Sequence, residues 1–358
     1  MSMIPPVPRD SHYMQLPREV LIGRNVAPLV GQTLVRLGFH GPVLMITGEK
    51  VNAIAGGVVL DSLKGANFRT ETLIVQSSTT EQVEEAERRI RQVAPDIVVG
   101  VGGGKDIDVA KLGSMKAGKG FVSVPTAASH DGIASPLVSM KGLDRPYSYV
   151  AHAPIAIVAD TSIIMKSPYQ LIASGCGDVV AKYTAVRDWK LAHRIKNEYY
   201  GDYAAELALM SSRVVIKNAA SIRTVTDSGV RTLVEALISC GVSMSIAGTS
   251  RPCSGAEHLF SHSLTMLAPK PALHGEQCGV GTIMCAYLHG ANWQLIRDFL
   301  QRIGGPTTAI ELGVDSDLVV KALTTAHSIR PERYTILGES GLTQEAAAKV
   351  ATITGVIE

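Results

Sequence analysis

Short runs of apolar, β-branched residues alternate with segments of helical periodicity through the first half of the chain. Such runs are typical of strands that are buried on both faces. They predict strands at 43–47, 70–75, 96–101, 121–125 and 154–160. Repetition of strand, helix and strand with short connections predicts a parallel sheet with flanking helices, and ligands of such sheets bind at the carboxyl ends of the strands.

An amphipathic helix is predicted between the second and third of these strands. Val83, Ile90 and Val93 recur at helical spacing and form one apolar face. Ser78 and Glu81 have the spacing of a capping box. We therefore expect the helix to begin at a Ser78 cap.

After about residue 166 the pattern changes to long, Ala-rich segments of helical periodicity, and no alternating strand pattern returns. A chain of 358 residues also exceeds the ~100–200 residues of a typical domain. We therefore predict an α/β domain over 1–165 and a helical domain over 166–358. The helical segments are 167–194, 202–222, 230–250 and 344–357.

Composition narrows the class of protein. Apolar residues make up 46% of the chain, and 34 basic residues nearly balance 32 acidic ones. No basic stripe is interleaved with aromatic residues, so nucleic acid is not an expected partner. The N-terminal stretch lacks the pattern of a signal peptide, and no uninterrupted apolar run reaches the ~18 residues of a membrane span. The apolar helical half predicts a homo-oligomer.

The cysteines point to a reducing compartment. There are five, an odd number, and none forms a C-x-x-C pair. A disulfide framework or a thiolate zinc site is therefore not expected, and we expect a cytoplasmic protein.

Three glycines form a turn that could bind phosphate. Gly102, Gly103 and Gly104 follow a predicted buried strand and precede a helix. Glycine lets backbone N–H groups approach a ligand closely, and a helix N-terminus favours an anion. The turn is not the Rossmann fingerprint, because Lys105 stands where the third glycine of G-x-G-x-x-G would be. A plain strand-to-helix turn is the alternative.

A second loop, SVPTAASHDGIASP over 123–136, carries small hydroxyl side chains just past a strand end. Thr126, Ser129 and Ser135 could hold phosphate or nicotinamide amide groups. The His-Asp-Gly at 130–132 could equally be a simple turn, because Asp-Gly favours one.

Histidines cluster in SGAEHLFSHSLTMLAPKPALHGEQ, over 254–277. His258 and His262 are four residues apart and would share a helix face, and His274 could reach the same cavity. Asp178, with glycines on either side of the preceding Cys176, is a candidate oxygen ligand. Zinc takes such ligands, but on spacing alone three unrelated histidines remain the alternative.

Five motifs in order give a family resemblance: GGGKDIDVAK, PTAASHDGIASP, SGCGDVVAKY, SGAEHLFSH and PALHGEQ. The chain resembles, over nearly its whole length, the family that holds dehydrogenases of glycerol 1-phosphate and of glycerol, iron-dependent alcohol dehydrogenases and dehydroquinate synthase. The last two motifs are most similar to the glycerol-1-phosphate branch. The resemblance implies an α/β nucleotide-binding domain, an all-helical metal-binding domain and an active site between them.

The resemblance also implies an activity: reversible reduction of dihydroxyacetone phosphate to sn-glycerol 1-phosphate with NAD(P)H, which in archaea supplies ether phospholipids. It implies zinc, polarising the carbonyl, on Asp178, His258 and His274. It implies substrate contacts at Asp131 and His262, and again at Asp178. The residues implied for the dinucleotide are Gly102, Gly103, Gly104, Lys105, Asp106, Asp108, Thr126, Ser129 and Ser135.

One departure bears on the metal. The iron-dependent branch is similar in having a histidine four residues after its aspartate, where this chain has Lys182. Three remaining ligands, one oxygen and two nitrogens, favour zinc with an open position. Glu49 and Lys50, side by side after the first predicted strand, favour use of both NAD and NADP.

Two questions stay open at this point. A zinc-dependent glycerol dehydrogenase, a lyase of the dehydroquinate synthase type and a catalytically inactive nucleotide-binding protein are alternative functions. The first would accept the unphosphorylated triol, and the second would return its NAD unchanged. The sequence does not rank the cations that could bind a substrate phosphate, which are Arg145, Arg223, Arg251 and Lys270.

Overall fold

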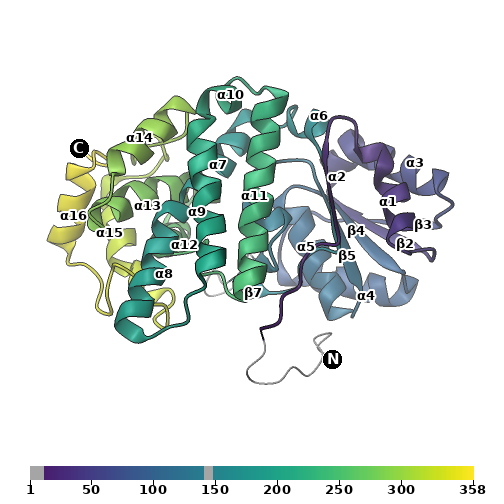
Figure 1. The fold of residues 1–358 in the computed structure, drawn as a ribbon, viewed down its shortest axis with the longest axis horizontal. Helices are drawn as coiled ribbons and strands as arrows, with labels where there is room; N and C mark the ends of the chain where they lie inside the picture. Colours follow the sequence, from purple (N-terminus) through teal and green to yellow (C-terminus); the bar gives the residue numbers. More distant parts are fainter. Residues whose placement is uncertain (1–11, 141–147) are drawn as a thin grey trace. The chain divides into compact units, whose positions relative to one another are not determined.

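The computed structural model describes residues 12–140 and 148–358, so Arg145 lies outside the described residues. The chain divides into two compact units (Figure 1). Unit 1 comprises Met1–Ala128 and Gly132–Ser167, and unit 2 comprises Ser129–Asp131 and Pro168–Glu358. The three-residue piece Ser129–Asp131 therefore belongs with the helical unit although it lies far earlier in the sequence.

Unit 1 contains a sheet of six parallel strands in the order β1-β8-β5-β4-β2-β3. All five predicted strands are present, each within two residues of its expected limits, and β1 joins them at one edge. The strands in spatial order are β1 (Glu19–Gly23), β8 (Ala156–Asp160), β5 (Gly120–Pro125), β4 (Ile97–Gly102), β2 (Val43–Thr47) and β3 (Thr70–Ile74).

The strand order reverses between β2 and β4. From β2 the chain continues to β3 on one side, and from β4 it continues through β5 to β8 on the other. Ligands of open parallel sheets bind outside the carboxyl ends of the strands at such a switch point. The glycine turn at Gly102–Gly104 directly follows β4, so it lies at this point of the sheet.

Helices cover both faces of the sheet. Val99 and Val101 of β4 face a core shared with α1 and α3, which contains Val30 and Val59. Gly100, between them, faces the other side, where an added Cβ would lie 2.8 Å from Cβ of Ala110 on α5. Glycine at this position lets α5 pack directly on the strand. The larger helices of unit 1 are α1 (Val30–Arg36), α3 (Gly57–Gly65), α4 (Thr80–Val93) and α5 (Gly104–Lys116).

The predicted start of the α4 helix is wrong by one residue. Its N-cap is Thr79, and no side chain caps it, so Ser78 and Glu81 do not form a capping box. Both hydroxyl residues suit a cap, and the sequence pattern did not distinguish them. The shorter elements of unit 1 are η1 (Ala27–Leu29), α2 (Glu49–Val51), η2 (Asn52–Gly56) and α6 (Thr161–Ile164), and η3 (Asp131–Ile133) begins at the last residue of the Ser129–Asp131 piece.

A small antiparallel pair, β6 (Leu137–Ser139) and β7 (Ser148–Val150), was not predicted. Three residues are too few to show an alternating pattern. The buried Lys111 of α5 donates to the carbonyl oxygens of Gly132 (2.7 Å) and Leu137 (2.8 Å), which fixes β6 to α5.

In unit 2 the regular elements among the described residues are all helices, as predicted. The segment predicted as one helix over 167–194 forms two, which meet at Ala181. The helices are α7 (Tyr169–Val180), α8 (Lys182–Lys196), α9 (Asp202–Lys217), α10 (Ala219–Arg223), α11 (Asp227–Ala247), α12 (Ala256–Leu267), α13 (His274–Leu288), α14 (Trp293–Arg302), α15 (Ser316–Thr325), η4 (Ala326–Ser328) and α16 (Gln344–Ile353).

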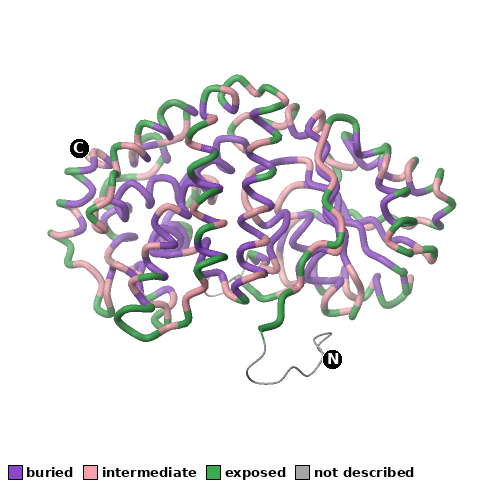
Figure 2. Tube along the Cα trace, viewed as in Figure 1, coloured by how far each residue is buried: buried purple, intermediate pink, exposed green. Residues whose placement is uncertain are grey.

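One helix, α11, has the length and composition of a membrane span. It has 21 residues, and 67% of its most apolar window is buried inside the protein. Figure 2 shows the long stretch of buried chain along α11, where it packs beside α9. A core helix passes the same length test, so α11 by itself is weak evidence for a span.

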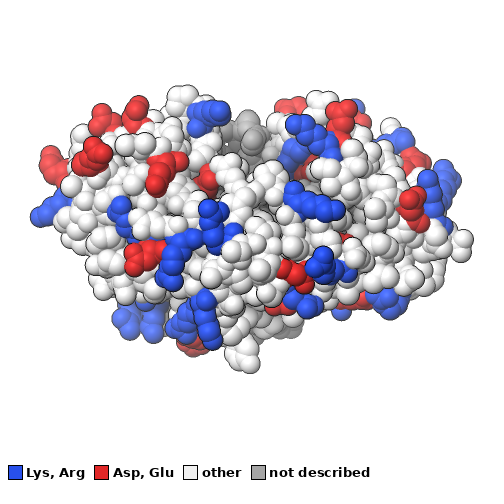
Figure 3. Space-filling view, turned by 90° about the horizontal axis from the view of Figure 1, so that it is seen from above, with Lys and Arg blue, Asp and Glu red and all other residues white. Residues whose placement is uncertain are grey.

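Charged side chains are mixed on the surface. On the face drawn in Figure 3, Lys and Arg side chains are interspersed with Asp and Glu. Elsewhere, surface ion pairs join the two kinds, for example Arg91 with Glu87 on α4 at 2.8 Å. Such exposed pairs contribute little to stability.

Candidate metal centre and active site

The site in unit 2 begins with a close approach of two helix backbones. A Cβ at Gly177 on α7 would collide with the carbonyl oxygen of Gly275 on α13, and a Cβ at Gly275 would collide with the carbonyl of Ser174. Only glycine fits at both positions. This contact sets Asp178, the next residue on α7, opposite His274, the first residue of α13.

Asp178 lies in a buried ion network. Its Oδ1 accepts a hydrogen bond from Nζ of Lys182 at 2.9 Å, and its Oδ2 accepts one from the backbone N–H of Asp131 at 2.8 Å. Nζ of Lys182 is also 2.8 Å from Oδ2 of Asp131. One ammonium group therefore holds both carboxylates, and the structure brings the predicted residues Asp131 and Asp178 together.

The charges in this network reinforce one another. Burial alone would raise the pKa of Asp178, but Lys182 and His258 outweigh it and hold that pKa well below its ordinary value. Burial alone would lower the pKa of Lys182, but the carboxylates of Asp131 and Asp178 raise it well above its ordinary value. Both groups are therefore charged at neutral pH.

The two histidines predicted as ligands are each oriented by a hydrogen-bond partner at Nδ1. Nδ1 of His258 is 2.9 Å from Oε1 of Glu257, and Nδ1 of His274 is 3.1 Å from Oγ of Ser261. Partners of this kind orient metal-binding imidazoles and leave the second nitrogen available. Both rings can thus present Nε2. Glu257 was not predicted, although its place directly before His258 was a signal for it.

Asp178, His258 and His274 fit a divalent metal. Nε2 of His258 lies 3.4 Å from Oδ1 of Asp178, and the His258 and His274 ring centroids are 5.1 Å apart. Two ligands at about 2.0–2.1 Å from a tetrahedral zinc are about 3.4 Å apart. A buried carboxylate with two imidazoles is also a donor set that zinc accepts.

The fourth predicted residue, His262, lies one turn after His258 on α12, and its ring centroid is 5.8 Å from that of His274. Burial lowers the pKa of His262 well below its ordinary value, and the neighbouring imidazoles and Arg330 and Arg333 lower it further. His262 is therefore neutral. The two arginines act on it from the chain after η4, and the sequence pattern gave no signal for either.

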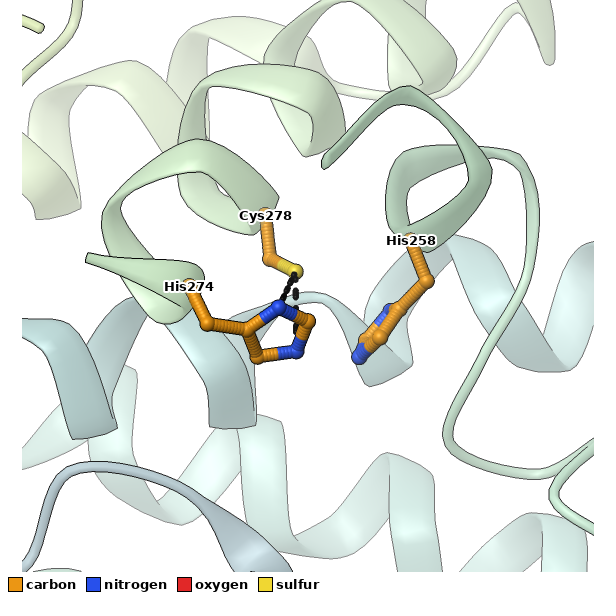
Figure 4. Close-up of side chains that lie close together, drawn as sticks. All are labelled: His258, His274 and Cys278. Atoms are coloured by element: carbon orange, nitrogen blue, oxygen red, sulfur yellow. Dashed lines mark hydrogen bonds between the residues drawn. The ribbon is translucent and has the colours of Figure 1, made fainter. Parts of the chain in front are cut away.

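The structure adds a sulfur atom to this cluster. Sγ of Cys278 on α13 lies 3.5 Å from Nε2 of His274, and His258, His274 and Cys278 form a group whose ligand atoms all lie within 4.8 Å of one another. Figure 4 shows the three side chains directed toward one point. Burial alone would raise the pKa of the Cys278 thiol, but His258 and His274 lower it to about 6.

In unit 1 the predicted glycine turn packs closely against Asp106 at the N-terminus of α5. Gly102 has φ +155°, a conformation that side-chain-bearing residues rarely adopt, and a Cβ there would collide with Asp106. Gly103 caps α5, and its N–H donates to Oδ2 of Asp106 at 3.3 Å. Gly48, at the end of the neighbouring strand β2, is also adjacent to Asp106 and Lys105.

The other residues implied for the dinucleotide are distributed differently. Thr126 donates its N–H to the carbonyl of Gly102 at 2.9 Å, so it lies beside the turn. Asp108 accepts a hydrogen bond from the N–H of Ser139, and Ser135 is buried near the same small sheet. Ser129 belongs to unit 2, where its carbonyl accepts from the Ser174 hydroxyl.

The candidate phosphate-binding cations in the described residues have different surroundings. Arg251 is buried and bonds Glu198, with 2.6 Å between its Nε and the nearer carboxylate oxygen. The Arg223 guanidinium stacks 4.7 Å from the ring centroid of Tyr169, and Lys270 is exposed. None of these contacts points to a bound phosphate.

Comparison with known proteins gives extensive matches. Residues 21–168 match the family model described as iron-containing alcohol dehydrogenase. A glycerol-1-phosphate dehydrogenase (NAD(P)+) of Thermococcus kodakarensis is 54% identical over 349 residues, which are 98% of this chain and 99% of the relative. The enzyme of the same name from Pyrococcus furiosus is 55% identical over 346 residues, 97% of this chain and 100% of the relative.

The fold is also shared with solved structures. A glycerol dehydrogenase from Schizosaccharomyces pombe superposes with a TM-score of 0.78 at 18% identity, covering 96% of this chain and 90% of the other. At that identity the likeness concerns the fold alone. The identity of more than half of all residues to full-length relatives shows more than fold: this chain belongs to the glycerol-1-phosphate dehydrogenase family.

Proposed function

We propose that this chain catalyses the reversible reduction of dihydroxyacetone phosphate to sn-glycerol 1-phosphate with NADH or NADPH, using bound zinc, and so supplies archaeal-type ether phospholipid synthesis. The observation that carries the proposal is the convergence of Asp178, His258 and His274 in unit 2. Nδ1 of each histidine ring has a hydrogen-bond partner, which leaves Nε2 available. Relatives 54–55% identical over nearly the whole chain are named glycerol-1-phosphate dehydrogenase (NAD(P)+), which supports the substrate and the cofactor of this proposal.

Asp178, His258 and His274 would hold the zinc, through one oxygen and two nitrogens. Three protein ligands leave a position for substrate. When bound, zinc supplies a Lewis acid that polarises the carbonyl and stabilises negative charge on its oxygen. The nicotinamide supplies the hydride, so the metal need not change oxidation state.

Asp131 would orient the substrate. Its Oδ2 is paired with Lys182, and its side chain is 16% exposed, so Oδ1 can accept a hydrogen bond from a substrate hydroxyl. Lys182 itself is fully buried and would position Asp131 and Asp178 without touching substrate.

His262 would contact a second substrate hydroxyl and move its proton. The residue lies one helical turn from His258, on the face of α12 that carries the cluster. A neutral imidazole has one N–H donor and one acceptor nitrogen, so it can serve in both directions of the reaction.

Unit 1 would bind the dinucleotide at the turn after β4. Its N–H groups and the N-terminus of the 13-residue helix α5 favour a pyrophosphate. Glu49 and Lys50 follow β2, the strand next to β4, and both are exposed. An acidic and a basic group together would accept either a ribose hydroxyl or a 2′-phosphate.

The first prediction concerns the reaction. Purified protein is expected to consume NADH and NADPH, followed by absorbance, when dihydroxyacetone phosphate is supplied. Dihydroxyacetone without the phosphate should react at least about 100-fold less efficiently. The protein groups that bind the phosphate would then have no partner, which costs several kcal/mol of binding free energy. Chelation should abolish the reaction, and zinc should restore it. An Asp178→Asn variant, which keeps the shape of the site, is the negative control.

Two outcomes would contradict this activity. Preference for the unphosphorylated ketone would make the chain a glycerol dehydrogenase. No net consumption of either reduced cofactor with either ketone would instead favour a reaction that returns NAD unchanged, as in the dehydroquinate synthase type.

The second prediction separates proton transfer from metal binding. His262→Ala should keep one zinc per chain, measured by elemental analysis, and lose about 100-fold or more in kcat, the usual contribution of a positioned acid or base. His258→Ala, the matched variant one turn away, should lose the zinc as well. Full turnover in His262→Ala would remove that residue from the mechanism.

The third prediction concerns the buried lysine. Lys182→Met leaves Asp131 and Asp178 facing each other with no cation between them. After chelation, the variant's free energy of unfolding, from urea denaturation, should be lower than wild type by about 3 kcal/mol, as found when one partner of a buried pair is removed.

The control for this prediction is Lys196→Met. Lys196 pairs with Glu339 at the surface, and exposed pairs often contribute nothing measurable. Equal stability of Lys182→Met and Lys196→Met would show that the buried network is not required for the fold.

A further inference from the structure

We propose that Cys278 is a fourth protein ligand of the metal, so that the centre without substrate has one oxygen, two nitrogen and one sulfur ligand. The inference rests on the metal centre of the proposed function and adds a thiolate to it. A thiolate would make the site selective for zinc, cobalt and cadmium over hard, oxygen-preferring cations such as magnesium.

The position of Cys278 on the helix brings its sulfur to the metal. His274 and Cys278 are four residues apart on α13, so their side chains lie on one face. Sγ of Cys278 is 3.5 Å from Nε2 of His274 and 3.9 Å from Nδ1, so it lies nearer the nitrogen that remains available. The other nitrogen already contacts Ser261.

The spacing matches a tetrahedral zinc. A sulfur at about 2.3 Å and a nitrogen at about 2.0–2.1 Å from such an ion are about 3.5 Å apart. The observed distance from Sγ of Cys278 to Nε2 of His274 is 3.5 Å. The distance from Oδ1 of Asp178 to Nε2 of His258, 3.4 Å, agrees with the oxygen–nitrogen edge. Each distance matches the separation of two ligands on a tetrahedral zinc, and the donor atoms of His258, His274 and Cys278 all lie within 4.8 Å of one another.

Cys278 differs from the other buried cysteines in its neighbours. Sγ of Cys253 lies 3.3 Å from the Ser243 hydroxyl and 3.4 Å from the carbonyl of Cys240, which are ordinary packing contacts. Cys285 lies on the same helix as Cys278 and is as deeply buried. Within the described residues, the group of converging His and Cys donors includes Cys278 and not Cys285.

Coordination of the metal by Cys278 requires only that its thiol lose a proton. A metal–sulfur bond forms as the S–H bond breaks, and the proton leaves to solvent, which is how metal binding to thiols ordinarily proceeds. No oxidation or reduction is involved. Zinc can expand from four to five ligands, so the thiolate leaves room for a substrate oxygen.

The test is the absorption spectrum of the full-length protein loaded with Co²⁺. Wild type should show an intense near-ultraviolet band from sulfur-to-cobalt charge transfer. Cys278→Ser should bind one Co²⁺ without that band, and Cys285→Ser, the matched control on the same helix, should keep it. Competition with a chromophoric chelator should show zinc affinity at least about 10-fold weaker in Cys278→Ser, since even residues outside the ligand set contribute that much.

Two results would overturn the inference: stoichiometric Co²⁺ in wild type without the band, or a band that persists in Cys278→Ser. The wild-type spectrum decides the question even if a variant does not fold. Either negative result leaves the proposed function standing when ketone reduction remains zinc-dependent, so the two claims fail separately.

Discussion

The carboxylate of Asp178 is the point at which the candidate site is assembled. Its two oxygens accept hydrogen bonds from Lys182 and from the backbone of Asp131, and Oδ1 faces His258. A carboxylate this deeply buried is stable only when it is paired. The same hydrogen bond holds Asp131, the first residue of η3, against α7. The pairing that stabilises the buried carboxylate therefore also positions the residue proposed to orient substrate.

The glycine contact between α7 and α13 makes this arrangement possible. Any side chain at Gly177 or Gly275 would push the helices apart and separate Asp178 from His274. Behind the rings, Glu257 and Ser261 fix the orientation in which each Nε2 is available. Helix packing sets the distances, and hydrogen bonds set the ring orientations, so the site is organised before a metal binds.

Much of the architecture could be predicted from sequence because burial leaves a pattern. Strands covered on both faces, such as 43–47 and 97–102, are continuous apolar runs. His258 and His262 are four residues apart on one helix, so their spacing alone predicted that they share a face. Other features depend on contacts that no local pattern records. In the sequence, Lys182 indicated only that a fourth histidine ligand was missing, because its partner Asp131 belongs to η3, far from it along the chain. Cys278 was set aside because it lacks a C-x-x-C partner, although its place four residues after His274 was a usable signal.

Metal binding at Asp178, His258 and His274 of unit 2 is tested most directly by anomalous X-ray diffraction from zinc-loaded crystals on both sides of the zinc absorption edge. One strong zinc-specific peak is expected within coordination distance of Oδ1 of Asp178 and of Nε2 of both histidines. A stoichiometric zinc whose peak lies elsewhere in the chain would contradict it.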